Sequence, residues 1–182
     1  MKKFFERYSY QCVTLFVNQI AIALFAISLA FAAGMAKNDT LKLITSILSV
    51  VFILFIDYTA MWKVGAEDRL SADLGKINRN LSVPVKIWLV SNSLNLLLAL
   101  LYTVGVFVNV LEGLKVCSVI ALLIEGEYMG ILSLSIGGVT LNTMWFMYFL
   151  ITVPSLIVNF VAYWFGVNNI GSGRLYAPPK QK

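Results

Sequence analysis

The chain has 182 residues, of which 59% are hydrophobic and 13% charged, and its formal net charge is +5. A soluble domain of this size cannot bury so much apolar surface, so the composition excludes an ordinary water-soluble fold and predicts an integral membrane protein. The modest positive charge does not indicate a nucleic-acid partner, because basic residues of a membrane protein usually set its orientation and contact anionic lipid.

The first part of the chain predicts a hairpin of two membrane-spanning helices, at 10–35 and 41–62, joined by a short polar turn. The first apolar run is longer than the core of a signal peptide, so we expect it to remain as a span. Small residues recur in it at every fourth position, at Ala26, Ala30 and Gly34. Such a ridge lets a second helix backbone approach closely, although Ala is also common in membrane helices.

The segment 63–84 is a long polar stretch between two apolar regions, and we expect it to be a cytoplasmic loop. Its regularly spaced apolar residues are Leu70, Leu74, Ile77 and Leu81. They would share one face of a helix, which predicts an amphipathic helix lying on the membrane surface. A solvated irregular linker is the alternative, because Gly75 weakens a helix by about 1 kcal/mol relative to Ala.

The second half of the chain predicts two further spans, at 85–110 and 142–165, followed by a cytoplasmic tail at 166–182. Pro84 suits the first turn of the third span, where its missing N–H has no helical partner. Pro154 lies inside the last apolar run, and we expect it to kink that helix.

The segment 114–134 decides between four spans and five. It holds a short apolar run followed by Glu125 and Glu127, and each charge near the bilayer centre would cost about 2.5–3.5 kcal/mol. Four spans with the N-terminus inside also keep most of the 14 Lys and Arg residues in the cytoplasm. We therefore expect an all-α integral membrane protein. The expected fold is a four-transmembrane-helix bundle with cytoplasmic N- and C-termini and an amphipathic or re-entrant segment between helices three and four.

Aromatic residues fall near the predicted span boundaries, where Trp and Tyr concentrate in membrane proteins. The predicted interface belt consists of Tyr10, Trp62, Trp88, Trp145 and Trp164.

Every predicted span carries an amide or an acid at a similar depth, counted at about 1.5 Å per residue from those boundaries. This polar layer consists of Asn18, Asp57, Asn92, Asn95 and Asn159. In one interpretation these groups form hydrogen bonds between helices and fix the bundle. In the other they line an inward-facing polar pocket for an ion or small solute, with Asp57 as its charge. In either case we expect Asp57 to face the bundle interior and to contact one of the Asn side chains.

No catalytic or metal-binding motif is recognisable in the sequence. The chain has no His and two Cys, and it contains no Walker A, HExxH or GxSxG pattern. The acidic pairs Glu67–Asp68 and Glu125-x-Glu127 are close neighbours in sequence, and we expect them to be solvated loop charges. The sequence therefore predicts no enzyme activity, no cofactor and no metal site.

Two stretches in the first half of the chain are distinctive. They are Phe16-Val17-Asn18-Gln19 in the first span and Tyr58-x-x-x-Trp62-x-x-Gly65-x-x-Asp68 at the end of the second. Together they resemble a group of small multi-spanning membrane proteins of Firmicutes, clostridia especially, which has no assigned function. The resemblance implies a multi-pass protein of a bacterial cytoplasmic membrane.

Two functions remain open at this point. The first is a non-enzymatic accessory or assembly module, with the segment 62–84 meeting a protein partner. The second is a small transporter or transporter subunit with an inward-facing polar pocket at Asp57. In both, the expected partners are the lipid bilayer and another protein or a second copy of the chain, and not nucleic acid.

Overall fold

The structure, a computed structural model, describes residues 2–78, 80–108 and 111–170. The longer helices are α1 (Lys2–Met35), α2 (Asp39–Asp73), α3 (Val83–Ser91), α4 (Ser93–Val108), α5 (Leu111–Ile124) and α8 (Val153–Asn168). The short elements are η1 (Gly126–Tyr128), α6 (Met129–Leu132), β1 (Ser135–Ile136), β2 (Val139–Thr140), η2 (Leu141–Thr143) and α7 (Met147–Leu150). The two strands pair in antiparallel fashion, with Ser135 opposite Thr140.

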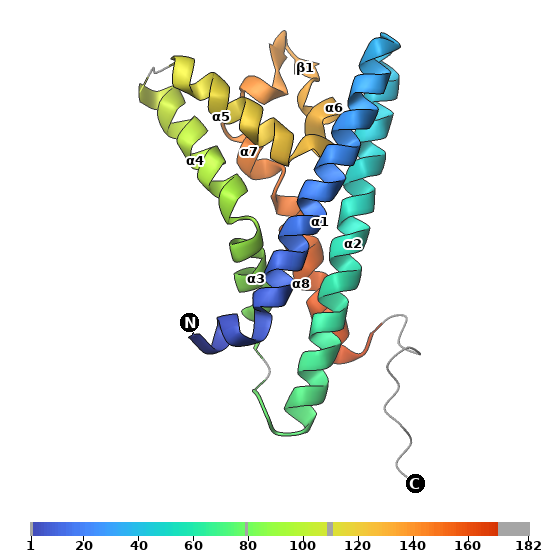
Figure 1. The fold of residues 1–182 in the computed structure, drawn as a ribbon, viewed down its shortest axis with the longest axis vertical. Coiled ribbons are helices and arrows are strands. Elements are labelled where there is room, and N and C mark those ends of the chain that lie inside the picture. Colours follow the sequence, from blue (N-terminus) through green and yellow to red (C-terminus); the bar gives the residue numbers. More distant parts are fainter. Residues whose placement is uncertain (1, 79, 109–110, 171–182) are drawn as a thin grey trace.

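The long helices run alternately up and down the molecule (Figure 1). Helices α1 and α2 form a hairpin, and α8 packs along α2 in the same direction as α2. Helix α4 leans away from α1 toward the upper end of the view, and α5, α6 and α7 lie in the space between them. The start of α1 and the ends of α2 and α8 therefore lie together at the lower end.

Three helical stretches are long and apolar enough to cross a membrane: α1, α2 and Met147–Asn168. Helices α3 and α4 would form a fourth span if they are counted together, although they meet at an angle of 63°. The prediction of a mainly helical protein is confirmed, and the structure contains helices that are long and apolar enough to cross a membrane. The number of four spans and the side of the membrane that holds each terminus remain predictions.

The segment 63–84 differs from the predicted loop, because α2 continues without a break to Asp73. The predicted amphipathic helix over 70–81 is wrong. The chain turns at Gly75, whose φ of 70° is a left-handed conformation that ends a helix readily. Side chains of α8 and α1 pack against the last turns of α2, and this packing keeps polar sequence in helical form.

The third and fourth predicted spans are each broken. The break between α3 and α4 lies at Asn92, whose side-chain amide donates to the Trp88 carbonyl at 3.2 Å. A side chain that competes for backbone carbonyls in this way interrupts a helix. Pro84 lies in the first turn of α3, as expected. Pro154 lies in the first turn of α8 and does not kink it, since a separate short helix, α7, precedes it.

The segment 114–134 folds back into the bundle instead of lying on its surface. Helix α5 is followed by η1 and α6, which contact both α1 and α2. Gly126 lies so close to α1 that an added Cβ would stand 2.6 Å from the Ala23 carbonyl oxygen. Glu125 and Glu127 flank this glycine and are consequently buried, at 4% and 2% exposure. The prediction that they are solvated loop charges is wrong.

Small residues allow α2 and α8 to pack closely. Gly65 of α2 and Gly166 of α8 face one another, and a Cβ on Gly166 would stand 3.0 Å from the Gly65 Cα. The predicted ridge on α1 is only partly used. Ala26 and Ala30 are buried, whereas Gly34 is exposed with open space around it.

Candidate functional site

A small cavity lies inside the bundle where five parts of the chain converge. It has a volume of about 20 Å³, which is room for a water-sized species. Its polar lining includes three acids and three amides: Asp57 of α2, Glu125 and Glu127 around the start of η1, Gln19 of α1, Asn92 at the α3–α4 break and Asn159 of α8. All six are buried. We call this set the acidic cavity.

Hydrogen bonds hold part of the acidic cavity in place. Gln19 Nε2 donates to Glu125 Oε1 at 3.2 Å, which joins α1 to the turn before η1. Ser46 of α2 donates its hydroxyl to the backbone carbonyl of Glu127. Asn95, one turn beyond the cavity, donates to Asn92 Oδ1 at 3.4 Å. These contacts fix the backbone around the acids while leaving much of their acceptor capacity unused.

Several buried oxygen atoms near the cavity have no hydrogen-bond donor among the described residues. Glu127 Oε2 and Asn159 Oδ1 both belong to cavity-lining side chains, and Asn95 Oδ1 lies on the same side of the bundle. No hydrogen bond of Asp57 is present within the described part of the chain either. Buried polar atoms almost always have a partner. Because these unpartnered atoms are acceptors, the missing partner is a donor, a proton or a cation.

The environment of the two glutamates, which lie outside the candidate spans, favours their neutral forms. Burial raises the pKa of Glu125, and the hydrogen bond from Gln19 opposes that shift only in part. Burial also raises the pKa of Glu127, and the charge of Glu125 adds to the effect. Raised pKa values of this kind bias both carboxyl groups toward the protonated, uncharged form. Acids with shifted pKa values are common at functional sites.

The structure brings together most of the predicted polar layer. Asp57, Asn92 and Asn159 share the cavity, and Asn95 bonds to Asn92. Asn18 does not line the cavity, because the adjacent Gln19 occupies the inward position on α1. We expected Asp57 to contact one of the Asn side chains. Among the described residues no hydrogen bond joins them, because the cavity lies between Asp57 and these amides.

In the sequence, Gln19 stands out only as part of the stretch that carries the resemblance, and the predicted polar layer does not include Gln19, Glu125 or Glu127. Gln19 carries a detectable signal, because it continues the buried positions Cys12 and Leu15 along one face of α1. The two glutamates carry none, since nothing local distinguishes them from loop acids.

The acids are not arranged as a conventional metal site. Within the described ranges, no group of three or more His, Cys, Asp and Glu side chains could hold a metal ion together. A cation in the cavity would therefore need amide oxygens as well as carboxylates, a donor set suited to hard cations.

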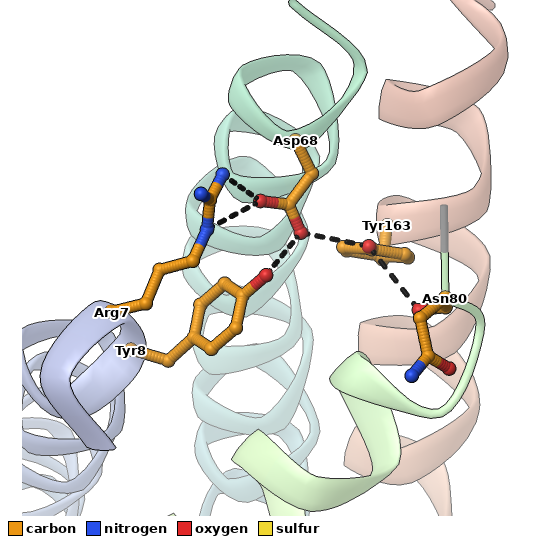
Figure 2. A network of polar contacts seen from close by, with 5 residues as sticks. All are labelled: Arg7, Tyr8, Asp68, Asn80 and Tyr163. Carbon is orange, nitrogen blue, oxygen red and sulfur yellow. Dashed lines mark hydrogen bonds and ion pairs between the residues drawn. The ribbon is translucent and has the colours of Figure 1, made fainter. Parts of the chain in front are cut away.

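A second polar cluster lies at the lower end of the bundle, centred on Asp68 (Figure 2). Arg7 Nη2 donates to Asp68 Oδ1 at 2.7 Å, and Arg7 Nε donates to the same oxygen at 3.2 Å. Tyr8 and Tyr163 donate their hydroxyls to Asp68 Oδ2 at 2.7 and 2.8 Å. The Tyr163 hydroxyl also lies 3.4 Å from the carbonyl oxygen of Asn80. We call these five residues the Asp68 cluster.

The Asp68 cluster ties together α1, α2, α8 and the connection before α3. Asp68 is 3% exposed, so the prediction that it is a solvated loop charge is wrong, whereas its neighbour Glu67 is exposed. Both carboxylate oxygens of Asp68 have donors, one of them a guanidinium. A buried carboxylate satisfied in this way stabilises a fold and has no acceptor free for a ligand.

The predicted aromatic belt divides into two groups. Tyr10, Trp145 and Trp164 are exposed on the surface, where lipid or water can reach them. Trp62 and Trp88 are buried and bind other parts of the chain: Trp62 Nε1 donates to the Ile170 carbonyl at 3.0 Å, and Trp88 Nε1 donates to Ser155 Oγ at 2.9 Å. These two indoles act in helix packing as well as at any interface.

No protein-family model, curated protein or solved structure matches the chain.

Proposed function

We propose that this protein is a small transporter, or a transporter subunit, that moves protons or a small monovalent cation through the acidic cavity. In this proposal it has four spans in a bacterial cytoplasmic membrane, with both termini in the cytoplasm. The single observation that carries the proposal is the presence of buried, unpartnered oxygen atoms on Glu127 and Asn159 beside the carboxylate of Asp57.

The physical argument concerns the cost of burying these oxygens. A buried acceptor without a donor costs about 1–3 kcal/mol, and an isolated buried carboxylate costs more. A bundle that served only as a scaffold would remove this cost with apolar residues or with matched donors. A proton on a carboxyl group, or a cation among the oxygens, satisfies the same atoms. Ionisable groups buried in this way commonly mark ion and proton pathways in membrane proteins.

The size of the cavity limits the substrate. About 20 Å³ accommodates a proton carrier, a water molecule or a bare cation, but no organic solute. The absence of a three-ligand metal arrangement among the described residues argues against a tightly held divalent ion. Since four helices barely enclose a pathway, we propose that the protein works as a homo-oligomer or with another subunit.

The accessory-module hypothesis is less well supported by the geometry. It requires the segment 62–84 to meet a partner, but Trp62, Ala66 and Asp68 are already buried against other helices of the same chain. Lys63 and Glu67 remain exposed on this part of α2. A partner would therefore have to meet mainly the turn after α2, where Leu74 and Leu81 are exposed.

Reconstitution into liposomes tests the proposal. Purified protein is placed in vesicles that contain a pH-sensitive dye, and an imposed K⁺, Na⁺ or proton gradient drives proton or cation movement. The wild type should dissipate at least one of these gradients faster than empty vesicles. Asp57→Asn and Glu127→Gln should slow it by roughly a hundredfold, which is about 2.7 kcal/mol in barrier height.

The matched control is Asp39→Asn, which removes an exposed acid at the start of the same helix as Asp57. It should leave the rate unchanged. Equal rates for wild type, Asp57→Asn and empty vesicles with all three gradients would reject the proposed function.

A further inference from the structure

Two hollows lie along the seam between α1 and α2, from the Asp68 cluster to the edge of the acidic cavity. A groove of about 230 Å³ is lined by residues of both helices, including Gln11, Thr14, Val64 and Glu67. An adjoining groove of about 370 Å³ shares Gln11, Val64 and Glu67 with it and extends to the Asp68 cluster. The two grooves therefore form one continuous surface depression, which we call the seam groove.

Leu15 separates the seam groove from the acidic cavity. It is the one residue that lines both the cavity and the nearer part of the groove, and it is 4% exposed. On α1, Gln11, Leu15 and Gln19 follow one another at intervals of four residues, so they lie along one face of the helix. A polar side chain thus precedes Leu15 on the groove side, and another follows it on the cavity side.

The seam groove contains its own unpartnered acceptor. Gln11 Oε1 is buried and accepts no hydrogen bond from the described residues. Its position between Glu67 and Leu15 in the groove lining provides an oxygen for a proton carrier or cation one helical turn before the barrier. This observation is independent of the acids in the cavity.

We propose that the seam groove is the access route to the acidic cavity and that the Leu15 side chain is the barrier that sets the rate of passage. This inference rests on the proposed function for what passes, but the accessibility of the route can be measured without any transport. The substrate class stays a proton or a small monovalent cation, because anything larger would not fit beyond Leu15.

The charges along the seam groove do not favour cations over anions, so any selectivity for cations must arise in the acidic cavity. Lys63 and Glu67 both line the groove, and Arg7 and Asp68 at its lower end pair with one another. These charges balance, so the groove itself should admit small ions of either sign. Discrimination in favour of cations then begins only past Leu15, at Asp57 and the two glutamates.

Thiol accessibility tests the route. In a background with Cys12 and Cys117 replaced by Ser, single cysteines are introduced at Thr14 in the groove, at Ile53 in the cavity lining and at Val13 on the exposed outer face of α1. The protein is reconstituted in vesicles and treated with a cationic and with an anionic membrane-impermeant methanethiosulfonate. Thr14→Cys should react with both reagents, and Val13→Cys, which faces lipid, should react with neither.

The barrier is tested by adding Leu15→Ala. The probe of the cavity is Ag⁺, a thiol-reactive monovalent cation small enough for a volume of about 20 Å³. Ile53→Cys should react slowly with Ag⁺ behind Leu15 and roughly tenfold faster in the Leu15→Ala background. The same Leu15→Ala change should raise the ion flux of the cysteine-free protein about tenfold, and Leu15→Phe should lower it.

An unreactive Thr14→Cys would overturn this inference even if the wild type transports ions. An Ile53→Cys that reacts equally fast with and without the Leu15→Ala change would overturn it as well. If the wild type shows no flux but the thiol pattern is as described, the proposed function fails and the access route stands. A circular dichroism spectrum and a monodisperse elution profile confirm for each variant that the protein is folded.

Discussion

The acidic cavity and the Asp68 cluster contain the same kind of group in opposite circumstances. In the Asp68 cluster a single carboxylate receives hydrogen bonds from Arg7, Tyr8 and Tyr163, and both of its oxygens are occupied. In the acidic cavity, three carboxyl groups line one small volume. Among the described residues, the side chain that donates to one of them is Gln19, which bonds to Glu125. In both sites the carboxyl groups themselves are buried.

The difference shows which carboxylate serves the fold and which are available for chemistry. A satisfied ion pair contributes to stability and resists exchange with solvent or ions. An under-satisfied cluster costs stability, and a cost of that kind is retained where a site binds something. We therefore regard the Asp68 cluster as the structural clasp of the bundle and propose the acidic cavity as its functional site.

The largest effect on stability should follow from removing the centre of the clasp. Asp68→Ala leaves the Arg7 guanidinium and two tyrosine hydroxyls without their shared acceptor, and we expect a loss of about 3–5 kcal/mol in the free energy of unfolding. Unfolding in detergent micelles, followed by circular dichroism, measures it. Glu67→Ala is the matched control and should change stability by no more than about 0.5 kcal/mol. If the two variants were equally stable, the clasp would have no energetic role.

Removing one donor should have a smaller effect. Tyr8→Phe deletes one hydrogen bond to the Asp68 carboxylate while keeping the ring, and we expect a loss of about 1.5–3 kcal/mol, as for other bonds to charged groups. Tyr163→Phe should behave similarly. Because both tyrosines bond to the same oxygen, the double variant should deviate from additivity. Purely additive losses would mean that the two hydroxyls act independently.

The acidic cavity should make stability depend on pH. The folded protein raises the pKa of Glu125 and Glu127 above the value of about 4.3 that glutamate has in an unfolded chain. Their contribution to the free energy of unfolding is thus fully present below that pH and is lost as the pH rises through the folded-state pKa. Thermal unfolding from pH 4 to pH 9 should show this decline. The double variant Glu125→Gln/Glu127→Gln should show a flatter profile, and an unchanged profile would contradict the assignment.

The smallest effect on stability should come from the cavity acid on α2. Asp57→Asn replaces a buried carboxyl group by a neutral amide of the same shape, and we expect stability to stay within about 1 kcal/mol of the wild type or to rise. The same unfolding measurement applies. A loss as large as that of Asp68→Ala would show that Asp57 belongs to the structural framework and would remove the contrast between the two sites.

Part of the polar layer could be predicted because depth along a membrane helix follows directly from position in sequence. Asp57, Asn92 and Asn159 were placed at one level by counting residues from the span ends, and they do share a cavity. The same counting failed for Asn18, since depth does not determine which face of α1 points inward. Gln19, one residue later, is the one that does.

The apolar composition and the lengths of the hydrophobic runs by themselves determined the helical class, the hairpin of the first two long helices and the capacity of these helices to span a membrane. These properties are local, because each helix satisfies its own backbone hydrogen bonds. Only the tertiary structure decided what becomes of the charges. Arg7 and Asp68 are 61 residues apart in sequence, and Gln19 and Glu125 are 106 apart. Whether an acid is solvated, paired or buried in a cavity depends on which distant segments fold against it, and no local pattern encodes that.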